Sequence, residues 1–231
     1  MEEIHIIIGT ITLLLIIGII SIFFSKKTII KRKLRRAPLK SIPSFRNGDL
    51  AKIVGSVELV DPPLKSPLSQ RSCCYFHVVV EQLVNSGKNH RWKKIIDVEK
   101  HNKYVLHQQG SYAYVNPEKL KSYLVQDKNY TSGIFNEPDE NLLKFLREYG
   151  YESKGFLGIN KRFRYKEGVL EKGEKVAVLG QGQWEEASQF GLPNSYDEVL
   201  GIHPPTKSYI YLTDDLDLTT GTPKKNQAII N

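Results

Sequence analysis

Two serines and an arginine, all within six residues, have the spacing that is best suited to chemistry in this chain. Ser66 and Ser69 supply hydroxyl groups, and Arg71 supplies a guanidinium that can donate two parallel hydrogen bonds to a carboxylate or a phosphate. The loop that holds them, SPLSQR, lies beside a segment rich in apolar residues. The three side chains therefore form a candidate anion clamp for a carboxylate, a phosphate or a lipid headgroup.

The same loop also has a purely structural interpretation. Pro67 restricts the backbone, and serine hydroxyls commonly hydrogen-bond to backbone groups within a turn. Arg71 would then pair with an acidic residue of a strand, such as Glu81 or Glu167. The residues alone leave both interpretations open.

The adjacent cysteines Cys73 and Cys74 do not predict a nucleophilic site with His77. Cys73 and His77 share one face of a strand but lie about 13 Å apart, which is too far for a hydrogen bond. Cys74 and His77 point to opposite faces, as do the two cysteines themselves, so a mutual disulfide is excluded. We expect two buried, inert thiols.

The remaining residue patterns predict no catalytic residue, cofactor or metal. The six histidines form no HxxxH or HExxH motif, and two cysteines cannot build a zinc cross-brace. Gly180-Gln181-Gly182 follows a predicted strand, but it has neither the third glycine nor the helix of a dinucleotide-binding motif, so we interpret it as a turn.

The elements that must position these residues are mostly strands. Apolar and β-branched patterns predict a strand over 49–59, where Gly55 marks a bulge or a close approach. They predict another over 73–84, whose near-continuous apolar run indicates burial on both faces. The second strand forms a long antiparallel hairpin with residues 90–98. Further strands are expected at 103–108, 111–115, 162–166, 174–179 and 209–212.

Two helices interrupt this pattern. Residues 137–150 have Pro and acidic residues in the first turn and end at Gly150, and residues 195–201 begin with a capping box. The fold class predicted is therefore α+β and β-rich: an antiparallel β-barrel or sandwich-like domain with one or two inserted helices. We expect the chain from Thr213 onward to be flexible.

An apolar N-terminal segment predicts where the domain works. Residues 4–24 contain no Lys, Arg, Asp or Glu and are long enough to cross a bilayer as one helix. Seven basic residues follow it: Lys26, Lys27, Lys31, Arg32, Lys33, Arg35 and Arg36. They predict an N-terminus outside and a cytoplasmic domain, and they would contact anionic lipid headgroups.

The domain organisation follows from this charge pattern. We expect a single-pass anchor over 1–25, a basic segment and linker over 26–47, a β-rich domain over 48–212 and a tail over 213–231. The chain carries a net charge of +8, and most of the excess lies in the basic segment. No later stripe of basic and aromatic residues suggests binding to nucleic acid.

Two blocks of residues resemble a known family. The first, PLKSPLSQRSCCYFHVVVE at 63–81, resembles the signature of the GIDE domain, also called the "beside a membrane" (BAM) domain. The second is similar to a family pattern RYxExxLxxGExVxVLG at 164–180. The family-like positions outside the clamp are Gly55, Pro67, Leu68, Cys73, Tyr75, Glu81, Trp92, Arg164, Tyr165, Glu167, Gly173 and Gly180.

The family includes membrane-anchored RING-type ubiquitin or SUMO ligases of mitochondria and plastids, together with bacterial proteins without a RING. The chain departs from the pattern at Gln70, where the family has glycine, and the sequence contains no RING for ubiquitin transfer. The resemblance therefore implies a membrane-anchored, non-catalytic binding or scaffolding module that engages an unknown protein partner or an anionic ligand. The candidate contact residues are Ser66, Ser69, Arg71, Glu81 and Trp92.

Two alternatives remain beside this interpretation. The resemblance alone implies an E3 ubiquitin or SUMO ligase-like role in organelle or membrane organisation. The other is a lipid-sensing module, whose salt-sensitive binding to anionic vesicles would persist when the charges of residues 26–36 are neutralised.

Overall fold

The computed structural model describes residues 5, 7, 10–13, 24–86, 89–126, 128–132, 138–155 and 158–220. Most of the predicted membrane span at 4–24 lies outside these residues. No helix within the described part of the chain is long and apolar enough to cross a membrane. Residues 5, 7 and 10–13 of the span are helical, and the side chains of Ile7, Ile11 and Leu13 are each more than half exposed.

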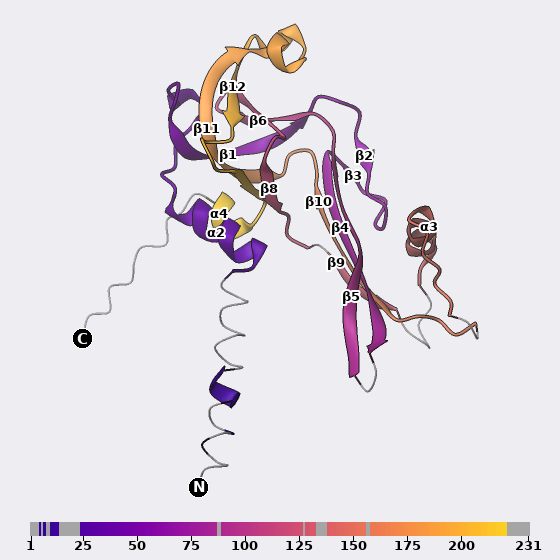
Figure 1. Ribbon diagram of the computed structural model, residues 1–231. Coiled ribbons are helices and arrows are strands. Elements are labelled where there is room, and N and C mark those ends of the chain that lie inside the picture. The colour runs from indigo at the N-terminus through magenta and orange to yellow at the C-terminus, as the bar shows by residue number, and fades with distance from the viewer. Residues whose placement is uncertain are drawn as a thin grey trace.

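Five strands close into a barrel (Figure 1). They are β1 (Leu50–Leu59), β6 (Tyr104–Gln108), β7 (Ser111–Val115), β12 (Glu198–His203) and β11 (Lys175–Glu186). β1 pairs with both β6 and β11, which closes the ring. The β-rich fold and the barrel are as predicted. The barrel is mixed rather than antiparallel, because β7 and β12 are parallel across a long connection.

β13 (Ile210–Thr213) and β8 (Leu120–Tyr123) extend the barrel sheet from β11. Helices α2 (Lys26–Arg36) and α4 (Leu216–Thr219) cover its outer surface at this point (Figure 1). Ile30 and Leu34 of α2 are fully buried in a cluster with Tyr211 and Leu218. The basic segment is therefore packed onto the barrel as a helix, and part of the tail predicted to be flexible is an ordered helix.

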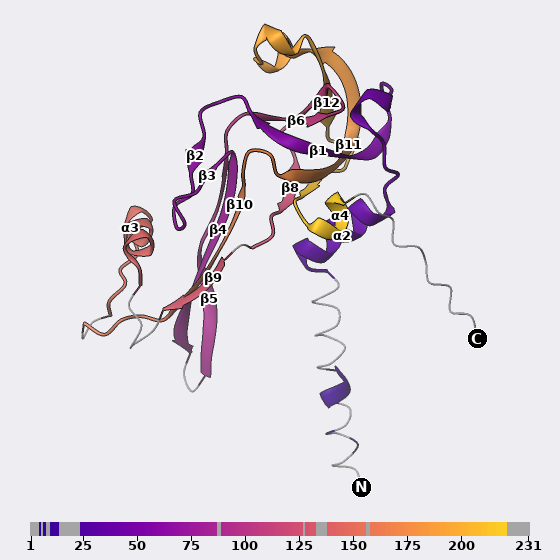
Figure 2. The same cartoon turned by 180° about the vertical axis from the view of Figure 1, so that it is seen from behind.

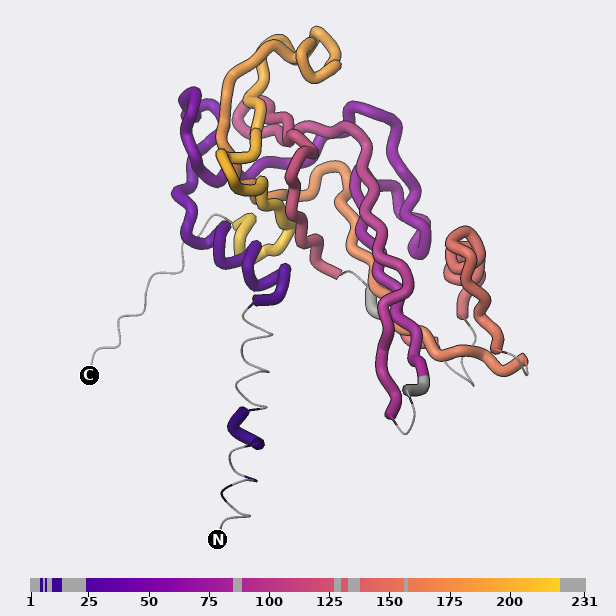
Figure 3. The backbone as a smooth tube through the Cα atoms, in the orientation of Figure 1, coloured from indigo at the N-terminus to yellow at the C-terminus, as the bar shows by residue number. Residues whose placement is uncertain are grey.

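A second sheet projects from the barrel, and Figure 3 traces its long hairpin. Its order is β5 (Asn89–His101), β4 (Tyr75–Ser86), β10 (Phe163–Leu170) and β9 (Lys128–Ser132). Helix α3 (Glu140–Glu148) covers one face, with Leu142, Phe145 and Leu146 buried against the sheet. The predicted hairpin and the first predicted helix are confirmed. Strands β8 and β9 were not predicted.

The adjacent cysteines connect the two cores. Cys73 ends β3 (Ser72–Cys73), which pairs with β2 (Leu64–Lys65), and its side chain joins the core of the four-stranded sheet. Cys74 lies in the barrel core. Burial raises the pKa of the Cys73 thiol to about 11 and that of Cys74 to about 12. Both are free and buried, as predicted.

The predicted turn at Gly180-Gln181-Gly182 is wrong, because all three residues lie inside β11. A Cβ at position 180 would lie 2.4 Å from Cγ2 of Ile202, and one at 182 would lie 2.4 Å from the ring of Phe45. The two glycines allow close packing inside a narrow barrel rather than a change of chain direction. Local sequence does not distinguish these two uses of glycine.

The second predicted helix, at 195–201, is also wrong. A short 3-10 turn, η3 (Asn194–Tyr196), ends at Asp197, whose φ is 55°, and β12 begins at the next residue. Val199 and Leu200 are fully buried as members of the barrel strand. Pairing with β11 and β7 outweighs the local capping signal.

Candidate functional site

The SPLSQR loop surrounds a carboxylate of the protein itself. The backbone N–H groups of Leu68 and Ser69 each donate to Glu167 of β10, over 2.9 Å. The Ser66 hydroxyl lies 2.8 Å from that of Ser69 and 3.4 Å from Oε2 of Glu167. Ser66 is fully buried, and Glu167 is only 2% exposed. The centre of the predicted anion clamp is therefore occupied by Glu167.

Arg71 points to a different acid from those expected. Its Nε donates to Oε1 of Glu171 over 3.0 Å, and its Nη2 donates to Oε2 of the same residue. This is a two-point ion pair in which each side chain is about one-third exposed. The geometry fits the structural interpretation of the loop, with Glu171 as the partner of Arg71.

The departure at Gln70 has a conformational explanation. Its φ is 58°, in the left-handed region that favours glycine. The side-chain amide of Gln70 donates to the carbonyl oxygen of Pro67 over 2.9 Å. The backbone N–H of Gln70 donates to the carbonyl oxygen of Ser66 over 3.1 Å. These hydrogen bonds hold a non-glycine residue in the turn.

The other two candidate residues lie on the opposite face of the sheet. Glu81 pairs with Arg164, whose guanidinium lies 4.7 Å from the ring centre of Trp92. Arg164 holds the pKa of the Glu81 carboxyl below its usual range. Side chains alternate between the faces of a sheet, and Glu167 is three residues from Arg164 on β10. The fold therefore separates the five candidates into a covered loop and an open cluster.

We call the face that carries Glu81 the open face. Beyond Phe76, none of the described side chains on this face is buried, whereas Val78, Val80 and Tyr165 on the other face belong to the core beneath α3. The prediction that β4 is buried on both faces is therefore wrong beyond Phe76. The open face includes His77, Val79, Glu81, Leu83, Trp92, Lys94, Asp97, Glu99, Thr131, Arg164 and Lys166.

Only part of the predicted hairpin edge is available. β4 lies between β5 and β10, so within the described residues β5 is the edge strand. The register of β5 shifts opposite Val80 and Glu81, where Ile95 is the extra residue, and Lys93 and Lys94 are exposed beside it. A bulge and exposed lysines are features that disfavour strand addition. The face, rather than the edge, is the accessible surface.

The base of the open face is tied to α2. Nζ of Lys26 lies 2.6 Å from Oε1 of Glu99, and the hydroxyls of Tyr75 and Ser122 donate to the other oxygen of Glu99. Burial alone would raise the pKa of Glu99, but hydrogen bonds from Lys26 and Tyr75 outweigh it and lower the pKa. The first basic residue after the apolar segment thus contacts the open face. Helix α3 lies on the far side of the sheet (Figures 1 and 2).

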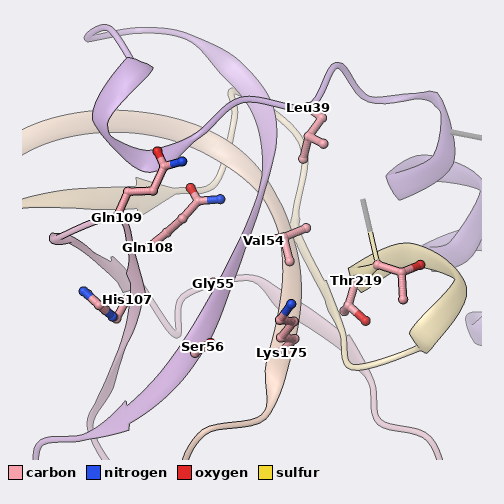
Figure 4. A pocket seen from close by; sticks show the side chains of 10 residues that line it. Leu39, Val54, Gly55, Ser56, His107, Gln108, Gln109, Lys175 and Thr219 are labelled. Carbon is pink, nitrogen blue, oxygen red and sulfur yellow. The ribbon is translucent and has the colours of Figure 1, made fainter. Parts of the chain in front are cut away.

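A second site candidate is a hollow of about 390 Å³ on the outside of the barrel (Figure 4). Strand β1 crosses it, with Gln108 and Gln109 to one side and Leu39 and Thr219 to the other. His107, near the end of β6, lies 3.4 Å from Glu58 and accepts a hydrogen bond from the backbone N–H of Gly110. The mixed amide and apolar lining does not indicate one class of ligand.

No group of three or more His, Cys, Asp or Glu residues in the described part of the chain is arranged to hold a metal ion. No protein-family model, curated protein or solved structure matches this chain. The resemblance to the GIDE domain therefore remains a prediction from the two residue blocks, and the function is argued from geometry.

Proposed function

We propose that this protein is a membrane-anchored binding module, whose open sheet face engages a protein partner next to the bilayer. The observation that carries the proposal is the contact between Lys26 and Glu99, because it joins the start of α2 to the base of the open face. The apolar segment that precedes α2 would be the anchor. A partner bound at the open face would then lie close to the membrane.

The chemistry of the two faces favours binding at the open one. On the covered side, Glu167 already accepts the backbone N–H groups of the clamp, so an external anion would have to displace a buried carboxylate. The open face offers an aromatic ring and a guanidinium within one cluster, and tryptophan and arginine are enriched in protein interfaces. Binding, rather than catalysis, is the activity that this surface suits.

Adjacent residues of β5 provide a matched test. In the register of β4 and β5, Lys94 lies opposite Glu81, on the open face. Lys93 lies opposite Gln82, on the other face. Both are exposed. A photo-crosslinking residue at position 94 of the full chain, in native membranes, should capture one dominant protein, and the same probe at 93 should not.

The result that would reject the open face is equal capture of that protein from both positions, or capture from 93 alone. Alkaline carbonate extraction of the same membranes tests the anchor separately, since an integral protein stays in the pellet. Recovery of the full chain in the soluble fraction would reject membrane anchoring, whatever the crosslinks show.

A further inference from the structure

The outer side of α2 contains a strongly basic hollow of about 500 Å³. It is lined by Lys27, Thr28, Lys31, Arg32, Arg35 and Arg36. All six residues come from one helix of 11 residues, whose apolar side is buried through Ile30 and Leu34. The packing of those two residues on the barrel therefore fixes the direction in which the hollow faces.

Helical spacing explains how one helix can line a hollow. Residues four apart lie above one another on a helix surface, so Lys27, Lys31 and Arg35 form one row and Thr28, Arg32 and Arg36 form the next. The hollow follows the space between the two rows. A ligand lying there meets long cationic side chains from both rows along about two turns of helix.

Two carboxylates of the described residues pair with cations that line the hollow. Asp215 lies 2.6 Å from Lys31, and Asp217 lies 3.7 Å from Arg35, both from the segment of α4. Lys31 and Arg35 are two of the five cationic side chains that line the hollow, and α2 itself contains no acidic residue. Like charges at this spacing repel each other, so an added anion would relieve the repulsion. The two acids also hold one row of the hollow in position.

From these observations we propose that the hollow binds a phosphate group, supplied by the headgroup of an anionic lipid. A phosphate offers several acceptor oxygens and up to two negative charges, which match donors arriving from two rows. A single carboxylate would use fewer of these donors. The proposal rests on the membrane anchoring proposed above, because Lys27 comes three residues after the apolar segment and a helix advances about 1.5 Å per residue. A soluble phosphate has the same chemistry, and the test separates the two sources.

Two exposed cations of α2 make a matched pair of variants. Arg36 lines the hollow and has no ion-pair partner within the described residues, whereas Lys33 does not line it. Each of Arg36→Gln and Lys33→Gln removes one positive charge from the same helix. The full chain is reconstituted in phosphatidylcholine nanodiscs that contain a minor fraction of phosphatidic acid, and enrichment of bound phosphatidic acid is measured by native mass spectrometry.

If the cations attract the bilayer only diffusely, both variants should lose the same share of the phosphatidic acid enrichment, up to about fivefold for one charge. If the hollow holds a phosphate, Arg36→Gln alone should lower the phosphatidic acid enrichment by about a further fivefold. At about 1 M salt the screening length falls to roughly 3 Å, so the effect of Lys33→Gln should disappear while that of Arg36→Gln remains. Equal effects of the two variants at both salt concentrations would overturn the site.

The source of the phosphate is decided by competition. If inorganic phosphate does not displace phosphatidic acid from the wild-type chain, the lipid assignment stands. Displacement at equal concentration would reject it in favour of a soluble phosphate. These outcomes are independent of the crosslinks from position 94: loss of the crosslink with retained lipid selectivity would count against the protein partner only. Failure of the chain to remain in the bilayer would count against the anchor.

Discussion

In the barrel each of the five strands has a neighbour on both edges, and the inward side chains fill a closed core. In the four-stranded sheet, β5 and β9 each have one neighbour within the described residues, and one face carries no covering helix. The chain passes between the two regions several times, for example through the short turn between β10 and β11. From this difference we infer that the barrel stabilises the fold, while the four-stranded sheet presents an accessible face for binding.

The largest effect on stability is expected inside the barrel. Gly180→Ala would place a methyl group 2.4 Å from Ile202 and 3.0 Å from the carbonyl oxygen of His203. Overpacking of this kind should lower the free energy of unfolding by about 2–3 kcal/mol. Urea unfolding of the full chain in detergent would measure it, with Gln183→Ala as the control because Gln183 is exposed on the same strand. If Gly180→Ala leaves the free energy of unfolding unchanged, the barrel core can accommodate the added methyl group, and the prediction of overpacking is wrong.

The next effect concerns the covered side of the four-stranded sheet. Glu167→Gln would turn an amide N–H₂ toward one of the two backbone N–H groups that now donate to separate oxygens of a buried carboxylate. The free energy of unfolding should fall by about 2 kcal/mol, which is typical of a lost hydrogen bond to a charged group. Glu171→Gln is the matched control: its ion pair with Arg71 is about one-third exposed, and the loss should stay below about 1 kcal/mol. Equal losses would mean that Glu167 is not the centre of the loop.

A smaller effect is expected where the two regions are joined. The side chains of Lys26 and Glu99 are 50% and 30% exposed, so a double-mutant cycle with Lys26→Met and Glu99→Gln should give a coupling of at most about 1 kcal/mol. The folded pKa of Glu99 is lowered, so its contribution is present above the unfolded pKa of about 4.3 and is lost as the pH falls through the lower folded value. The coupling should therefore be constant near neutral pH and decline only in acid. A decline in the coupling already between roughly pH 6 and 7 would contradict the assignment to Glu99.

The smallest effect on stability is expected at the open face. Lys94→Ala and Lys93→Ala both remove exposed side chains of β5, and each should change the free energy of unfolding by less than about 0.5 kcal/mol. Co-purification of the partner captured from position 94 should fall for Lys94→Ala only. If both variants lose the partner without losing stability, the open face and its opposite face do not differ as proposed.

Much of the local structure could be predicted from the sequence. Apolar alternation located β1, β4, β5, β6 and β7, and the first predicted helix is present, although Asp139 caps it from outside rather than lying in its first turn: its side chain accepts from the N–H of Leu142. Two of the failures share one cause. Gly180 and Gly182 look like a turn, and Ser195 with Glu198 looks like a helix start, until β11 and β12 pair in the barrel.

The candidate site was predicted less completely, because its groups come from distant positions. Glu167 was named as a partner for the loop, but its acceptors face the backbone of Leu68 and Ser69 rather than Arg71. Glu81 and Trp92 were correctly placed on the hairpin, yet no local signal assigns them to the opposite face from Ser66. The contact of Lys26 with Glu99 joins residues 73 positions apart and has no sequence signature.

By itself the sequence determined the apolar segment at 4–24, the basic run that follows it, the β-rich class and the burial of both cysteines. These depend on composition and on short-range periodicity, which each segment carries alone. Only the tertiary structure decided that the anion clamp holds Glu167, that the sheet keeps one open face, and that five cations of α2 line a common hollow. Those outcomes depend on which strands pair and on which face each helix packs, and they follow from the summed packing of the whole chain rather than from any one segment.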